Sequence, residues 1–153
     1  MGAVVSYEVT DRVAVVTIER PDQRNAMSLD VFDRLRECAE RADHDDVGAV
    51  VVCGRGGVFS SGIDTSVFGG QSERGIDRAF IDRLQRSFTA YEDCTKPTIA
   101  AIEGYCFGAG IQLAAACHLR AVAPSAELAV LEARWGLIPD LGGTYRLPRL
   151  VGL

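Results

Sequence analysis

Two short segments of small residues have the composition and spacing to stabilise negative charge. Ser60-Ser61-Gly62 and Gly108-Ala109-Gly110 each follow a predicted strand and precede a predicted helix or turn. Small side chains at such a turn let a ligand approach the backbone, whose N–H groups point outward and can hold an anion. If the two loops face each other, they can stabilise a carbonyl oxygen that gains negative charge during a reaction.

Other common kinds of site lack their patterns in this sequence. Neither loop matches the glycine fingerprint of dinucleotide-binding proteins or the P-loop. The five cysteines and two histidines show no metal-ligand spacing, so we expect no metal site. Most of the cysteines have apolar neighbours, which is typical of reduced thiols in a cytosolic protein. The N-terminus has no basic stretch followed by an apolar one, so we expect no signal peptide and a cytoplasmic location.

The composition is that of a folded domain. The sequence has 153 residues, of which 48% are hydrophobic and 24% are charged, and this excludes intrinsic disorder. We expect a single domain over residues 1–153. The net charge of −5 argues against a nucleic-acid partner, which needs a basic face. The apolar residues 97–117 contain Glu103 and Gln112, so we expect buried core there rather than a membrane span.

Strands and helices alternate along the predicted chain, which indicates an α/β fold. Two amphipathic helices are predicted, one from Ser28 to about Ala42 and one over 77–92. Residues 66–75 are predicted to be a polar, mobile loop. Strands and shorter helices follow from the remaining apolar runs, namely strands within 7–19, 47–53, 98–103, 118–123 and 127–130, and helices over 111–117 and after Thr144.

Four segments resemble the crotonase superfamily, the enoyl-CoA hydratases and isomerases, in order and spacing. They are residues 96–117, 25–28, 59–64 and 136–144, and the resemblance covers essentially the whole chain. It implies a spiral of ββα units that binds an acyl-CoA thioester as substrate, without a further cofactor. Relatives normally continue into C-terminal helices that cover the site and build a trimer. This sequence lacks those helices, so we expect a truncated chain with a groove and one core face exposed.

The resemblance also implies roles for individual residues. The thioester oxygen would accept hydrogen bonds from the N–H groups of Ser61 and Ala109. A further set of residues would line the groove for the substrate and its CoA portion, namely Arg24, Ala26, Ser60, Gly62, Ile63, Asp64, Gly108 and Pro139. Arg24 suits a phosphate, although an arginine at such a position is otherwise most simply a solvated surface residue.

The acid–base positions depart from the pattern of the hydratases. The family supplies two such groups, and here the first is Gln112 and the second is Glu132. Because an amide cannot activate water or deliver a proton well, Gln112 favours isomerisation over hydration. Asp140 is a third candidate, either as a second carboxyl group in the pocket or as a cap of the turn at residues 142–144. Two carboxyl groups in one apolar pocket are not both readily ionised, so one can act as acid and the other as base.

The sequence therefore predicts an enoyl-CoA isomerase with Glu132 as the proton-transferring base and Asp140 as its partner. One alternative is an enoyl-CoA hydratase in which Asp140 replaces the missing carboxylate. Another is a non-catalytic acyl-CoA-binding fragment. We expect no nucleic-acid or membrane partner, and the resemblance implies a homo-oligomer.

Overall fold

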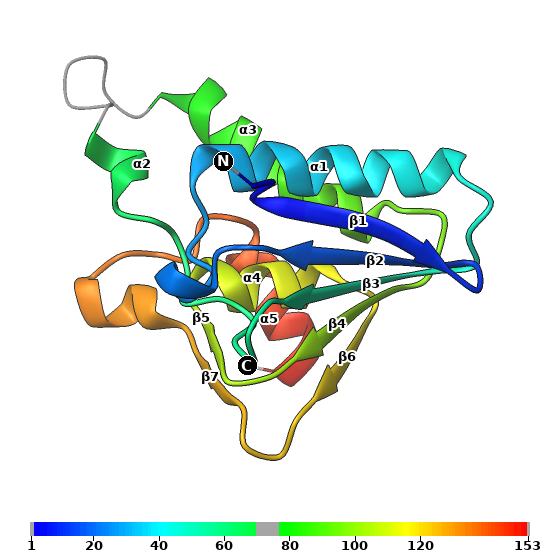
Figure 1. The fold of residues 1–153 in the computed structure, drawn as a ribbon. Helices are drawn as coiled ribbons and strands as arrows, with labels where there is room; N and C mark the ends of the chain where they lie inside the picture. Colours follow the sequence, from blue (N-terminus) through cyan, green and yellow to red (C-terminus); the bar gives the residue numbers. More distant parts are fainter. Residues whose placement is uncertain (1, 70–76, 153) are drawn as a thin grey trace.

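The residues that the structure describes form two β-sheets, and helices pack against them (Figure 1). The structure, a computed structural model, describes residues 2–69 and 77–152. The larger sheet has five strands, in the order β1 (Val5–Thr10), β2 (Val13–Ile18), β3 (Ala49–Gly54), β4 (Thr98–Ile102) and β6 (Leu119–Val122). The smaller sheet pairs β5 (Tyr105–Phe107) with β7 (Glu127–Ala129). All of these strand pairs are parallel except β1 with β2.

Helical segments separate the strands. The α-helices are α1 (Leu29–His44), α2 (Ser66–Gly69), α3 (Arg78–Glu92), α4 (Ala109–Ala116) and α5 (Gly143–Val151). Two short 3-10 helices, η1 (Pro21–Gln23) and η2 (Leu131–Trp135), lie in loops.

The chain path repeats a ββα unit. β4 joins the larger sheet, β5 joins the smaller one, and α4 follows; β6, β7 and α5 repeat this order. An isolated parallel bridge between Ser60 and Cys106 adds the segment after β3 to the smaller sheet. The α/β fold of ββα units predicted from the sequence is therefore confirmed.

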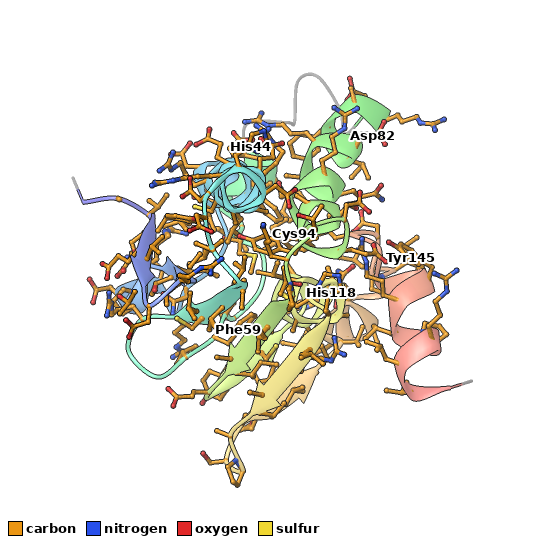
Figure 2. The ribbon with its side chains drawn as sticks, turned by 90° about the vertical axis from the view of Figure 1, so that its right-hand side faces the viewer. His44, Phe59, Asp82, Cys94, His118 and Tyr145 are labelled. Carbon is orange, nitrogen blue, oxygen red and sulfur yellow. The ribbon has the colours of Figure 1, made fainter. Side chains whose placement is uncertain are left out.

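One face of the larger sheet packs against helices. Burial alternates along β3 and β4, so that Val50, Val52, Ala100 and Ile102 are buried while their neighbours are partly exposed. α1 and α3 pack on each other beside this buried face, with Phe32 and Phe88 in contact at a ring separation of 5.4 Å. In Figure 2 the strands lie on one side of the molecule, and α1, α3 and α5 lie on the other.

The long helices were predicted well, and the short elements less so. α1 and α3 confirm the two amphipathic helices, and Asp77 caps α3 by accepting a 2.8 Å hydrogen bond from the Phe80 N–H. No strand was predicted over residues 105–107, where β5 lies, and the loop predicted over residues 108–110 contains the start of α4. The expected polar loop begins with the helix α2, and the part of that prediction over residues 70–75 lies outside the described residues.

The cysteines are all unpaired, and four of the five are buried. Burial raises the pKa of Cys38 to about 11 and the pKa values of Cys106 and Cys117 to about 12. These thiols therefore stay protonated at neutral pH and act as small apolar side chains in the core. Within residues 2–69 and 77–152, no helix combines the length and apolar character that crossing a bilayer requires.

A buried arginine fastens α5 to α3. The Arg146 guanidinium is 3% exposed and donates hydrogen bonds to Glu92, to the Thr89 hydroxyl and to the Leu141 carbonyl oxygen, at distances of 2.6 to 3.0 Å. Tyr145, on α5 beside α3 (Figure 2), also donates to Glu92. Burial raises the pKa of the Glu92 carboxyl, but these hydrogen bonds outweigh it and hold the pKa below its ordinary 4.5.

Replacing Arg146 should destabilise the protein in a pH-dependent way. We expect Arg146→Met to lower the free energy of unfolding at neutral pH by about 2 kcal/mol, because Glu92 and the Leu141 carbonyl lose their main donor. The stabilisation from a lowered carboxyl pKa is present above the unfolded-state pKa and is lost as the pH falls through the folded-state pKa. The difference between variant and parent should therefore shrink below the ordinary pKa of 4.5.

Urea denaturation across this pH range measures the effect. The control is Arg12→Met, which removes an exposed ion pair with Asp46 and should change the free energy of unfolding by less than about 0.5 kcal/mol. Equal losses in the two variants would contradict a structural role for the Arg146 cluster.

Candidate active site

A cavity of about 200 Å³ lies between α3, the start of α4 and residues 131–141. Its wall is mainly apolar and comes from four parts of the chain, with side chains that include Ile63, Phe80, Ile81, Leu84, Ala109, Ile138 and Leu141. Three polar residues, Gln112, Glu132 and Asp140, share this lining. The structure thus brings together all three predicted acid–base positions in one largely apolar pocket.

The Glu132 carboxylate has two unlike oxygens. η2 carries this residue, and its Oε1 accepts a 2.7 Å hydrogen bond from the Gln112 amide. Its Oε2 is buried and has no hydrogen-bond partner among the described residues. Burying a carboxylate oxygen without a hydrogen-bond partner costs free energy. Oε2 of Glu132 is therefore a candidate for contact with a substrate.

Asp140 lies at the rim of the same pocket. Its side chain is exposed, and its backbone N–H donates to the Ile138 carbonyl oxygen at 2.9 Å. The Asp140 side chain does not cap the turn at residues 142–144. The Gly143 N–H in that turn donates to Gln112, and the Thr144 N–H donates to the Pro139 carbonyl oxygen. Asp140 is therefore free of that capping role.

The two glycine-containing loops lie directly against each other. The Ser60 N–H donates to the Tyr105 carbonyl oxygen at 2.9 Å, and the Phe107 N–H donates to the Ser60 carbonyl oxygen at 3.0 Å. A Cβ atom at Gly110 would lie only 3.0 Å from the Ser60 carbonyl oxygen, and one at Gly62 would lie 3.6 Å from the Ala109 nitrogen. Glycine at both positions permits this approach.

The carboxylate also lies beside the second loop. Gly108 adopts φ 53° and ψ −117°, a conformation that favours glycine. A Cβ atom added there would sit 3.5 Å from Glu132 Oε1. The loop that begins α4 and the carboxylate of η2 are therefore immediate neighbours.

The structure corrects one predicted donor. The Ser61 N–H donates to the Arg24 carbonyl oxygen at 2.9 Å, so the prediction that it holds a substrate oxygen is wrong. Ile63, two residues later, is the other residue of this loop to consider. Met27 pairs with both neighbours of Ile63, donating to the Gly62 carbonyl oxygen and accepting from the Asp64 N–H. In a parallel bridge this turns the Ile63 N–H away from Met27.

The Ile63 and Ala109 N–H groups have no acceptor among the residues that the structure describes. Ala109 is the first residue of α4, where backbone N–H groups have no partner within the helix. Both residues line the pocket that contains Glu132. Two free donors and the Glu132 carboxylate thus share one largely apolar cavity, with Asp140 at its rim.

The remaining predicted residues divide into structural and exposed groups. Ser60 is fully buried, and its hydroxyl donates to the Asn25 carbonyl oxygen and accepts from the Gly62 N–H, so it shapes the loop rather than lining the pocket. Arg24 is exposed, and Ala26 and Pro139 are partly exposed. They remain candidates for contact with the CoA portion.

Asp64 takes part in local contacts that hold the first loop. Hydrogen bonds from Ser66, assisted by Arg20 at 2.9 Å, hold the pKa of its carboxyl below the ordinary value. Arg20 also donates to the Ala26 carbonyl oxygen, so this ion pair ties residues 20–26 to residues 60–64.

Sequence reasoning missed two features of this site. Asn25, fully buried with φ 54°, accepts from the Arg20 N–H and donates to the carbonyl oxygens of Arg55 and Val58. The second feature is the apolar face of α3. It was predicted as one face of an amphipathic helix, but it was not predicted to form a wall of the pocket. Among the described residues, no group of three His, Cys, Asp or Glu side chains lies close enough to hold a metal ion.

Comparison with known proteins agrees with this geometry. The sequence profile described as enoyl-CoA hydratase/isomerase matches residues 8–153. This chain belongs to that family. The resemblance to the crotonase superfamily inferred from four sequence segments is thereby confirmed.

Individual relatives are similar to nearly the whole of this chain. The chain is 42% identical over 157 residues to the glyoxysomal fatty acid beta-oxidation multifunctional protein MFP-a of Cucumis sativus, covering 99% of this chain and 21% of the relative. It is 38% identical over 161 residues to the mitochondrial Delta(3,5)-Delta(2,4)-dienoyl-CoA isomerase of Mus musculus, covering 96% of this chain and 49% of that protein.

A solved structure of a Thermobifida fusca YX protein in complex with acetoacetyl-CoA superposes with a TM-score of 0.84 at 34% identity. The match covers 98% of this chain and 62% of that one. The chain thus spans between about a fifth and about three fifths of the length of these relatives.

The close approach of the two loops can be tested at Gly110. An alanine inside a helix usually stabilises it relative to glycine by about 1 kcal/mol. We expect Gly110→Ala to do the opposite and lower the free energy of unfolding by about 1–3 kcal/mol, because its Cβ would press on the backbone of Ser60.

Denaturant unfolding of Gly110→Ala and Gly48→Ala measures this effect. The control position has an ordinary φ, and an added Cβ would meet nothing closer than the Arg12 carbonyl oxygen at 3.8 Å. Gly48→Ala should therefore leave stability unchanged or slightly raised. A stabilised Gly110→Ala variant would show that the loops are not in tight contact.

Proposed function

We propose that this chain binds an acyl-CoA thioester and shifts a carbon–carbon double bond of the acyl group. The thioester oxygen lies between the N–H groups of Ile63 and Ala109. Oε2 of Glu132 removes a proton from the α-carbon of a 3-enoyl group, and the C–H electron pair moves toward the thioester oxygen as an enolate. The same carboxyl group then returns the proton to the γ-carbon, which leaves the double bond one position nearer the thioester.

The arrangement around Glu132 is the observation that carries this proposal. One of its oxygens is held by Gln112, and the other is buried without a partner among the described residues, in a pocket that also contains two free backbone donors. A carboxylate that removes a proton from carbon needs an oxygen without another partner. The enolate that forms needs hydrogen-bond donors already in place around its oxygen. The cavity offers both.

Gln112 favours isomerisation over hydration. Adding water requires one group to activate the water and another to protonate carbon, whereas moving a double bond requires one base that takes and returns a proton. The neutral amide of Gln112 cannot supply the second group.

Hydration with Asp140 as the second group is the alternative, and the position of Asp140 in the lining of the same pocket supports it. The family includes both hydratases and isomerases, so the family alone does not decide between them. Binding of the CoA portion near Arg24, assembly into a trimer and a cytoplasmic location remain predictions from the sequence.

Turnover with two substrates separates these possibilities. Purified chain is mixed with a 3-enoyl-CoA or with crotonyl-CoA, and the product is followed by absorbance and mass. Double-bond migration without a gain of 18 Da (the mass of water) supports the isomerase, and water addition without migration would reject it. An absence of turnover, with a melting temperature raised by CoA esters, would favour a non-catalytic binder.

Glu132→Gln should remove the activity. General acid–base catalysis contributes about 10²- to 10⁴-fold to a rate, so we expect a loss of that size in kcat. The matched control is Glu127→Gln, an exposed carboxylate on β7, which should retain the parent rate. An unchanged rate in Glu132→Gln would refute the proposed role of this residue.

Ala109→Pro should remove one donor while leaving the fold intact. Proline is well tolerated as the first residue of a helix, where it removes the unpaired N–H and places its ring Cδ in the direction of that hydrogen. Because losing one such donor costs about 10²- to 10³-fold in kcat, we expect at least that loss, with a nearly unchanged melting temperature. The control is Arg78→Pro, at the first position of α3, which should keep full activity. Full activity in Ala109→Pro would mean that its N–H does not hold the substrate.

A further inference from the structure

The Gln112 side chain is clamped between two groups that fix its orientation. It is 1% exposed, its Oε1 accepts a 3.0 Å hydrogen bond from the Gly143 N–H, and its Nε2 donates the 2.7 Å hydrogen bond to Glu132. A backbone N–H can only donate, so the amide oxygen must face Gly143. The NH₂ group must then face the carboxylate.

The N-terminus of α5 is built closely around this amide. A Cβ atom at Gly143, the first residue of α5, would lie 2.9 Å from Gln112 Oε1 and 2.7 Å from the Pro139 Cβ. Only glycine lets the helix start come this near. α5 is held in turn against α3 by its own Arg146, which donates hydrogen bonds to Thr89 and Glu92.

We propose that Gln112 is a positioning residue that links the start of α5 to the Glu132 carboxylate and leaves Oε2 as the single oxygen that exchanges a proton with substrate. This inference rests on the proposed function of Glu132 as a base. Hydrogen bonds to carboxylates are stronger than those between neutral groups, so the amide holds Glu132 in one orientation. Because an amide does not titrate, this donor is present at every pH.

Gln112→Glu tests the proposal with little change in shape. The new carboxyl group still accepts from the Gly143 N–H, but it donates to Glu132 only while the pair holds a proton. Two adjacent carboxyl groups lose their protons in two separate steps. The parent rate should show a single rise with pH and no later fall, because the Gln112 amide remains a donor to Glu132 at every pH. The variant rate should rise and then fall by about 10- to 100-fold in kcat as the second proton leaves, since the donor is replaced by a negative charge.

The matched control is Gln85→Glu. The Gln85 amide donates to the backbone carbonyl oxygen of Asp140 at the rim and does not touch Glu132. This variant also adds a carboxyl group near the pocket, so its profile should keep the single rise. A single rise in Gln112→Glu as well would overturn the positioning role.

A readout without turnover keeps the two proposals distinguishable. In NMR spectra of the ¹⁵N-labelled chain, the Gln112 side-chain NH₂ signal should be shifted by its contact with the carboxylate and should move in Glu132→Ala. An inactive parent chain in which this signal moves would refute the proposed function but support the contact. A signal unaffected by Glu132→Ala would overturn the link, whatever the activity.

Discussion

The backbone of residues 60–63 lies directly against that of residues 105–110, and the rest of the site depends on this contact. Ser60 joins both the Tyr105 carbonyl and the Phe107 N–H, while glycines at 62 and 110 remove the side chains that would separate the loops. The contact brings the free Ile63 and Ala109 N–H groups to one cavity. Because these donors belong to the backbone, their direction is fixed by the fold rather than by side-chain rotation.

The Glu132 carboxylate lines the same pocket as these donors and comes from a later part of the chain. Glu132 comes from a 3-10 helix after β7, so its position depends on the small sheet and on Gln112 rather than on its own sequence neighbours. The cavity wall around it is apolar, which strengthens electrostatic interactions inside and makes the unpartnered Oε2 costly without a ligand. The same features suit an enolate, whose charge the two N–H groups would take up.

Sequence reasoning succeeded where periodicity carries the information. The apolar stripe of α3 and the continuous apolar strands β3 and β4 follow from local patterns, and four motif segments identified the family. It failed at short elements whose partners are distant. β5 has three residues, and its pairing with β7 is set by the fold around it. The assignment of the Ser61 N–H as a donor to the substrate met the same difficulty, because the Arg24 carbonyl that accepts from it lies 37 positions earlier in the chain.

A crystal structure of this chain with a bound saturated acyl-CoA, an unreactive substrate analogue, tests the central claim most directly. The account predicts the thioester oxygen at about 2.7–3.1 Å from the nitrogens of both Ile63 and Ala109, with Oε2 of Glu132, rather than Oε1, nearest the α-carbon. A thioester oxygen bound elsewhere, or an α-carbon facing away from Glu132, would contradict it.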